Sequence, residues 1–199
     1  MDESSSNTLA EMAEAVAKAK NILASSPLPS DPRTFMELEI FSDMIREHEA
    51  MLQSCTKCDY HSVIQHSRRI MERLYQGIWH SRCATDSQIA NHDVKQVFPN
   101  SAFRMAQEID GSCRANGQFK EMRKHIWSIL GRFANFELEE VGRRKTQCGI
   151  EPPYRDEEIE YMVITCTQCV LLVAEDLLRI RGFHEKSIEI EVILRAAAS

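Results

Sequence analysis

Apolar residues recur every three or four positions over most of this chain, which is the spacing of one face of an α-helix. The first such stretch predicts a helix from Thr8 to about Ser25, where Thr8 and Glu11 form the pattern of an N-terminal capping box. A loop rich in Ser and Pro follows, and Asp31 then precedes a proline suited to the first helical position. We therefore expect a second helix from Pro32 to about Leu52.

The same spacing continues in the rest of the chain. It predicts helices over residues 59–77, 101–109, 118–141 and 156–180. Glycines just past the last two stretches, and three acidic residues at the start of 156–180, are typical of helix ends. The tail SIEIEVIL alternates like a strand but has no evident strand partner, so it is expected to be either a helix or an extended segment.

The sequence turns polar and irregular between residues 79 and 99. This stretch is the best candidate for a boundary between two helical halves. The predicted fold class is therefore all-α, with two small helical bundles in one chain. The first would comprise residues 1–95, and the second residues 96–199, including the long basic helix.

Composition favours an intracellular protein without a membrane span. The N-terminus MDESSSN is acidic and polar, unlike a signal peptide, and apolar runs such as Val170–Ala174 are too short to cross a bilayer. Seven cysteines form an odd number scattered through helical segments, which indicates reduced thiols better than a disulfide framework. No nucleophile elbow, phosphate loop, zinc-protease motif or paired-carboxylate motif occurs, so we expect no enzymatic activity.

The net charge of −6 conceals an uneven distribution of charge. Residues 61–145 carry 14 basic and 9 acidic side chains, whereas residues 1–60 carry 5 and 11, and residues 146–199 carry 5 and 10. A basic central segment could bind the phosphates of a nucleic acid, and the alternative is an ordinary fluctuation in the charge of solvated helix faces.

The candidate RNA-binding residues are basic side chains of this central segment, together with one tryptophan. On the long helix, Lys120, Lys124 and Trp127 share one stripe, where ammonium groups could meet phosphates and the indole could stack on a base. The predicted basic surface also includes Arg68, Arg69, Arg73, Arg123, Arg132, Arg143, Arg144 and Lys145. Each of these could equally be a solvated surface charge, and cations at a helix C-terminus also favour the helix dipole.

Cysteine and histidine pairs suggest a zinc site. Cys55 and Cys58 form one pair, and His80 and Cys83 form another, with His61 and His66 between them. A single helix between the pairs would hold them about 25 Å apart, too far for one tetrahedral site. Cys166 and Cys169 offer a further pair, which would make a four-cysteine site if the fold brought it to Cys55 and Cys58. The alternative is that these cysteines are small buried thiols.

The segment FKEMRKHIWSILGRFANFELEEV, residues 119–141, resembles the Glu-Met-Arg-centred helix of the small RNA-silencing suppressors of closteroviruses, the beet yellows virus type, with a crinivirus member as one alternative. Residues 34–52 are similar to the second helix of those proteins, and residues 161–180 fall where their last helix does. The cysteine pairs and the tail beyond Gly182 have no place on the family pattern.

The resemblance implies an all-helical homo-oligomer, a ring whose basic inner face holds RNA in the host cytoplasm. Such proteins sequester double-stranded RNA, including small interfering RNA, without cleaving it. Lys120, Arg123 and Lys124 fall within the matching motif. Leu28-Pro29 also loosely resembles an F-box-like motif, which would engage a host ubiquitin-ligase adaptor. The alternative function is a helical protein–protein adaptor with a structural zinc ion held by the cysteine and histidine pairs.

Overall fold

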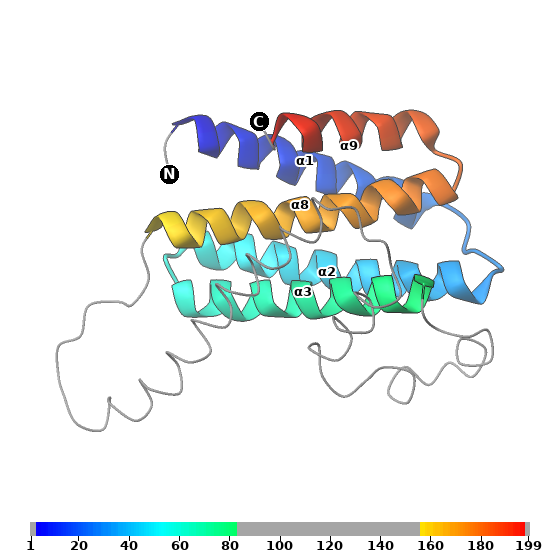
Figure 1. The fold of residues 1–199 in the computed structure, drawn as a ribbon, viewed down its shortest axis with the longest axis horizontal. Helices are drawn as coiled ribbons and strands as arrows, with labels where there is room; N and C mark the ends of the chain where they lie inside the picture. Colours follow the sequence, from blue (N-terminus) through cyan, green and yellow to red (C-terminus); the bar gives the residue numbers. More distant parts are fainter. Residues whose placement is uncertain (1–2, 83–155, 198–199) are drawn as a thin grey trace, which may run out of the picture.

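A computed structural model describes residues 3–82 and 156–197 of the chain (Figure 1). This part of the protein contains helices and no strands, which confirms the all-α class for the described residues. The helices are α1 (Glu3–Ser25), α2 (Pro32–Thr56), α3 (Tyr60–Arg82), α8 (Asp156–Ile180) and α9 (His184–Ala196).

Local side-chain chemistry fixes the starts of α2 and α3. The carboxylate of Asp31 accepts hydrogen bonds from the backbone N–H of Thr34 at 2.8 Å and from its hydroxyl at 2.7 Å, and Pro32 occupies the first turn. Asp59 plays the same part before α3, because it accepts from the Ser62 backbone N–H at 3.2 Å and from the Ser62 hydroxyl at 2.6 Å. These carboxylates satisfy N–H groups that have no partner within the helix.

The end of α8 is set by a glycine. Gly182 has a φ of 81°, a left-handed conformation in which a side chain would be strained. The backbone N–H of Phe183 donates to the carbonyl of Leu178 at 2.8 Å across this turn. The chain is thereby reversed into α9, and the predicted bounds of α8 are confirmed.

Three predicted helix ends are wrong. α1 begins at Glu3, so Thr8 lies inside the helix and does not cap it. α2 continues about one turn beyond Leu52. α3 continues through Gly77 to Arg82, and a Cβ atom at position 77 would make only an ordinary contact, 3.6 Å from Cγ2 of Ile40 on α2. The ambiguous tail is the helix α9.

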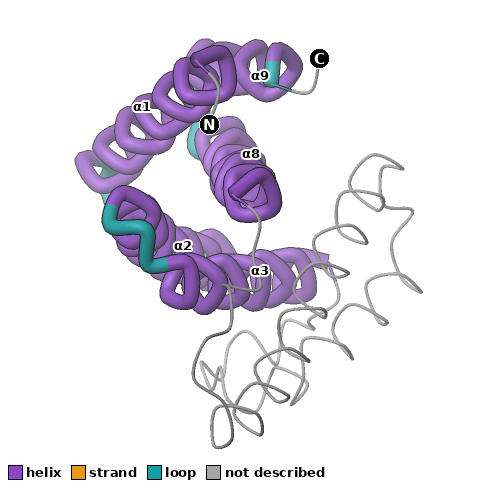
Figure 2. Tube along the Cα trace, turned by 90° about the vertical axis from the view of Figure 1, so that its left-hand side faces the viewer, coloured by secondary structure: helices purple, strands orange, loops and turns teal. Residues whose placement is uncertain are grey.

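The helices form three layers, which are clearest when the bundle is viewed end-on (Figure 2). α1 and α9 make one layer, α2 and α3 make the opposite layer, and α8 lies between them. This central position explains why α8 buries residues towards both outer layers. They are Ile159, Met162, Val163, Thr165, Cys166, Thr167, Cys169, Val170, Leu171, Ala174, Leu177 and Leu178.

Of the described helices, α8 alone is long and apolar enough to cross a membrane by length and composition, a test that the core helix of a bundle also passes. Its most apolar stretch is 61% buried inside the bundle. The sequence expectation of no spanning segment considered only short apolar runs, and it overlooked the length of this helix. Its packing against the other helices accounts for its apolar composition.

Helices from both predicted halves share one hydrophobic core. Buried residues of α1, α2 and α3 pack with those of α8 and with Ile190 of α9. α3 and α8 run in the same direction, because Tyr60 donates to Asp156 at 2.6 Å near their first turns and Cys169 contacts Met71 further along. The described part of the predicted second bundle thus packs on the first, while the predicted boundary between residues 95 and 96 lies outside the described residues.

Candidate nucleic-acid interface

The structure describes part of the predicted basic surface. Arg68, Arg69 and Arg73 lie on α3. The other candidate residues lie outside the described residues, and they are Lys120, Arg123, Lys124, Trp127, Arg132, Arg143, Arg144 and Lys145.

Arg68 and Arg69 are exposed and Arg73 is half-buried, and each of these three contacts a carboxylate of the same chain. Arg68 Nε lies 3.0 Å from Glu72 Oε1. Arg69 Nη1 lies 3.4 Å from Glu47 Oε2, and Arg73 Nη2 lies 3.2 Å from Asp43 Oδ2, so both of these pairs join α3 to α2. We call this surface the α2–α3 charged face, and it comprises Asp43, Arg46, Glu47, His66, Arg68, Arg69, Glu72 and Arg73.

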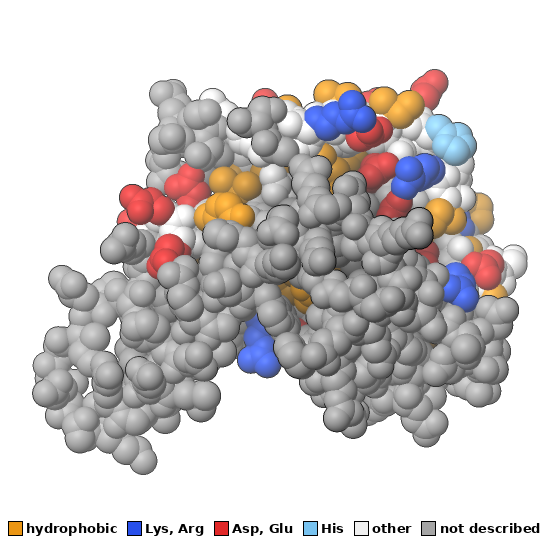
Figure 3. Space-filling model, viewed as in Figure 1, with side chains coloured by type: hydrophobic (Ala, Val, Ile, Leu, Met, Phe, Trp, Pro, Cys, Tyr) orange, Lys and Arg blue, Asp and Glu red, His pale blue; other side chains and the backbone are white. Residues whose placement is uncertain are grey.

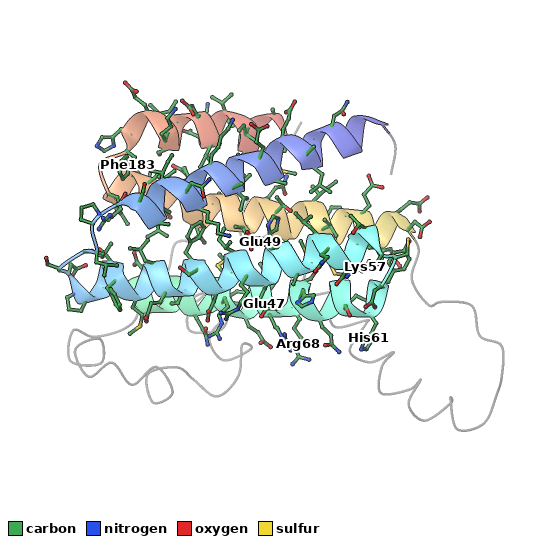
Figure 4. All side chains as sticks on the ribbon, turned by 180° about the vertical axis from the view of Figure 1, so that it is seen from behind. Glu47, Glu49, Lys57, His61, Arg68 and Phe183 are labelled. Carbon is green, nitrogen blue, oxygen red and sulfur yellow. The ribbon has the colours of Figure 1, made fainter. Side chains whose placement is uncertain are left out.

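Glu47 contacts two basic side chains of α3. It lies at the junction of α2 and α3, whereas Arg68 points away from the bundle (Figure 4). Glu47 accepts from His66 Nδ1 at 2.8 Å as well as from Arg69. Partial burial raises the pKa of Glu47, but the hydrogen bond from His66 and the charge of Arg69 outweigh it and leave this pKa below its usual value. Glu47 is therefore ionised at neutral pH and holds α3 against α2.

The carboxylate partners of the arginines on the α2–α3 charged face compete with phosphate for these side chains. The side chains of Arg68 and Arg69 are 62% and 57% exposed. Solvated ion pairs of this kind contribute about 0–1 kcal/mol, so a phosphate can replace the carboxylate at little cost. The face holds four arginines and three carboxylates, so its excess of positive charge is small when His66 is neutral. It can support RNA contacts made elsewhere but is too weakly basic to supply strong binding alone.

The structure does not bring Cys55, Cys58, Cys166 and Cys169 together in a group that could hold a metal ion. Cys166 and Cys169 are buried in the core, where their Sγ atoms lie 3.9 Å from the Ser67 carbonyl oxygen and from Met71 Sδ. Burial raises the pKa of Cys166 to about 12 and that of Cys169 well above its usual value, so both remain thiols at neutral pH. They are the buried thiols that the sequence offered as the alternative.

The other cysteine pair lies at the turn between α2 and α3. Cys55 is half-buried, and Cys58 is exposed with a φ of 56°. Among the described residues, no three potential ligands come together in a group that could hold a metal ion. His80 and Cys83, the remaining predicted ligands, belong to the part of the chain whose side chains the structure does not describe.

A shallow cleft of about 210 Å³ lies between α1, α8 and α9, and the sequence analysis did not find it. Its floor is apolar and includes Ile22, Leu178 and Ile190, while Lys18 and Lys186 stand on its rim beside glutamates. Lys18 pairs with Glu14 at 2.7 Å and Lys186 with Glu189 at 2.6 Å, so the lysines are already neutralised within their own helices. The cleft has no group with evident reactivity.

No protein-family model, curated protein or solved structure matches this chain. The resemblance of residues 119–141 to the closterovirus suppressors therefore remains a prediction from the sequence.

Proposed function

We propose that this protein binds double-stranded RNA without catalysis and suppresses RNA silencing by sequestering small interfering duplexes in the host cytoplasm. The observation that carries the proposal is the separation of charge along the chain. Residues 3–82 and 156–197, which form the described bundle, contain 13 basic and 20 acidic side chains. Residues 83–155 contain 11 basic and 9 acidic side chains.

This distribution favours one location for RNA binding. An acidic bundle repels the phosphate backbone, and most of the RNA-binding energy of such proteins comes from cations that neutralise phosphates. We therefore assign the main phosphate contacts to Lys120, Arg123 and Lys124, which the sequence places within one turn of a predicted helix. The arginines of the α2–α3 charged face would add weaker contacts by exchanging their carboxylate partners.

The test is RNA binding by a variant in which Lys120, Arg123 and Lys124 are all changed to Glu. We expect its affinity for a short RNA duplex to fall at least about 100-fold, because three attractive phosphate contacts become repulsive. Gel retardation with purified full-length protein measures the effect. The matched control changes Lys18, Lys20 and Lys186 to Glu, which alters the net charge equally on the acidic bundle.

A loss of RNA affinity in the Lys120/Arg123/Lys124 variant, without a comparable loss in the control, supports the assignment. Equal losses in both variants would instead indicate a general effect of net charge, and undiminished binding by the first variant would remove these residues from the RNA site. The alternative function of a zinc-stabilised adaptor rests on Cys55, Cys58, His80 and Cys83, and no three potential metal ligands come together among the described residues.

A further inference from the structure

The helix α9 is apolar on two sides. Its inner side buries Ser187 and Ile190 against the bundle. On the opposite side, Ile188 and Val192 are 58% and 60% exposed. Figure 3 shows hydrophobic side chains gathered along the edge of the molecule formed by α9, beside basic and acidic ones.

This double-sided pattern explains why the tail looked like a strand in the sequence. Ile188, Ile190 and Val192 alternate with the polar residues Ser187, Glu189 and Glu191, as expected for a strand. In the helix, Ile190 and Leu194 face the core, whereas Ile188 and Val192 face outwards. Folding of the single chain therefore satisfies only half of the apolar pattern of α9.

The exposed apolar pair lies within a stripe that is charged at both ends. Glu185, Ile188, Val192 and Arg195 follow one another at spacings of three, four and three, so they share one face of the helix. The acidic end precedes the apolar centre and the basic end follows it. We call these four residues the α9 outer stripe.

We propose that the α9 outer stripe binds the same stripe of a second copy of this protein, with the two helices antiparallel about a twofold axis near residue 190. In this arrangement Ile188 packs on Val192 of the other copy, and Glu185 faces Arg195 at both ends. A parallel pairing would instead bring like charges together. The charge pattern is thus complementary to itself in one orientation, as a twofold interface requires.

The neighbouring charges of α9 are compatible with this pairing. Glu189 and Glu191 flank the stripe and approach their counterparts across the axis. Lys186 pairs with Glu189, and Arg195 also contacts Glu191 on its own helix, which reduces the repulsion between the flanking glutamates. Arg195 can serve both carboxylates, because a guanidinium group presents five N–H donors.

The size of the stripe sets the expected strength of the dimer. A helix of 13 residues is about 20 Å long, and it covers far less than the roughly 800 Å² per partner of a standard stable interface. The dimer should therefore be weak and reversible, with a dissociation constant in the range of tens to hundreds of micromolar. It does not depend on RNA binding.

The experiment is sedimentation of the full-length protein from about 5 to about 500 µM, a range that spans this expected dissociation constant. The unmodified protein should pass from monomer to dimer, and the variant Ile188→Asp/Val192→Asp should stay monomeric with unchanged helical circular dichroism. A protein that stays monomeric over the whole range would overturn the proposal, as would a dimer that this variant leaves intact.

Charge reversal tests the orientation without altering the apolar centre. Glu185→Lys and Arg195→Glu should each weaken self-association about tenfold, because each places two like-charged pairs across the axis. An equimolar mixture of the two single variants should form a heterodimer at least as strong as the original dimer, and the double variant should recover self-association.

The matched control is Glu14→Lys/Lys18→Glu, which reverses a charge pair on α1 that lines the cleft and lies away from the α9 outer stripe. It should leave the dimer unchanged. The antiparallel pairing is wrong if this control weakens the dimer as much as the stripe variants do. It is also wrong if a mixture of the two single variants forms no heterodimer.

Discussion

Replacing Leu171 by alanine is expected to lower the free energy of unfolding by about 2–5 kcal/mol. Leu171 is fully buried in α8, the helix between the two outer layers. The substitution removes apolar contacts and leaves a cavity that the surrounding helices can fill only in part. Because native stability is typically about 5–15 kcal/mol, the loss would bring the protein close to unfolding at physiological temperature.

The matched control makes the same chemical change at an exposed position. Leu28 lies in the loop between α1 and α2 and is 76% exposed, so Leu28→Ala should alter the stability by no more than about 0.5 kcal/mol. Urea denaturation followed by circular dichroism measures both variants. Similar stability of the two would contradict the central position of α8.

Lowering the pH from 6.5 to 4 is expected to cost about 3 kcal/mol of stability through His48 alone. His48 is 2% exposed, and its Nε2 lies 2.9 Å from Thr167 Oγ1. The Thr167 hydroxyl donates to the Val163 carbonyl at 2.8 Å, so it accepts from His48, which fixes a neutral ring with the proton on Nε2. Burial lowers the pKa of His48 to about 4, and the charge of Glu49 opposes this only weakly.

The sign of the effect follows from the lowered pKa. Between pH 6.5 and 4 the unfolded chain binds a proton at this histidine and the folded chain does not, so acid favours unfolding. His48 does not reduce the stability above the unfolded pKa of about 6.5. Below it, the free energy of unfolding falls as the pH is lowered, and the loss levels off below the folded pKa of about 4.

Two variants isolate this contribution from that of the carboxylates. His48→Leu should show a shallower loss of stability between pH 6.5 and 4 than the unmodified protein, whereas His184→Ala, at an exposed position of α9, should follow the unmodified profile. Identical pH profiles for the unmodified protein and His48→Leu would show that His48 is not held neutral in the core.

The sequence predicted well those features that depend on neighbouring residues. Asp31 and Pro32 marked the start of α2, and Gly182 marked the end of α8, because caps and left-handed turns are set within a few positions of the chain. The start of α1 was predicted wrongly. The capping pattern at Thr8 marks a possible helix start, but residues 3–7 are also helical, so the helix begins earlier.

Contacts between distant residues could not be predicted in this way. The pairs Arg69–Glu47 and Arg73–Asp43 join residues 22 and 30 positions apart, so nothing in the basic pattern of α3 revealed that carboxylates of α2 would contact it. The packing of α8 on both outer layers was equally hidden, because an apolar helix gives no sign of which neighbours will cover it.

The most direct test of the proposed function is a titration of the unmodified protein with a labelled RNA duplex of about 20 base pairs at several salt concentrations. We predict binding whose affinity falls linearly with salt on logarithmic axes, with a slope of about −0.9 for each phosphate neutralised, and weaker binding to DNA of the same sequence. No binding at low salt, or an affinity unaffected by salt, would contradict the account.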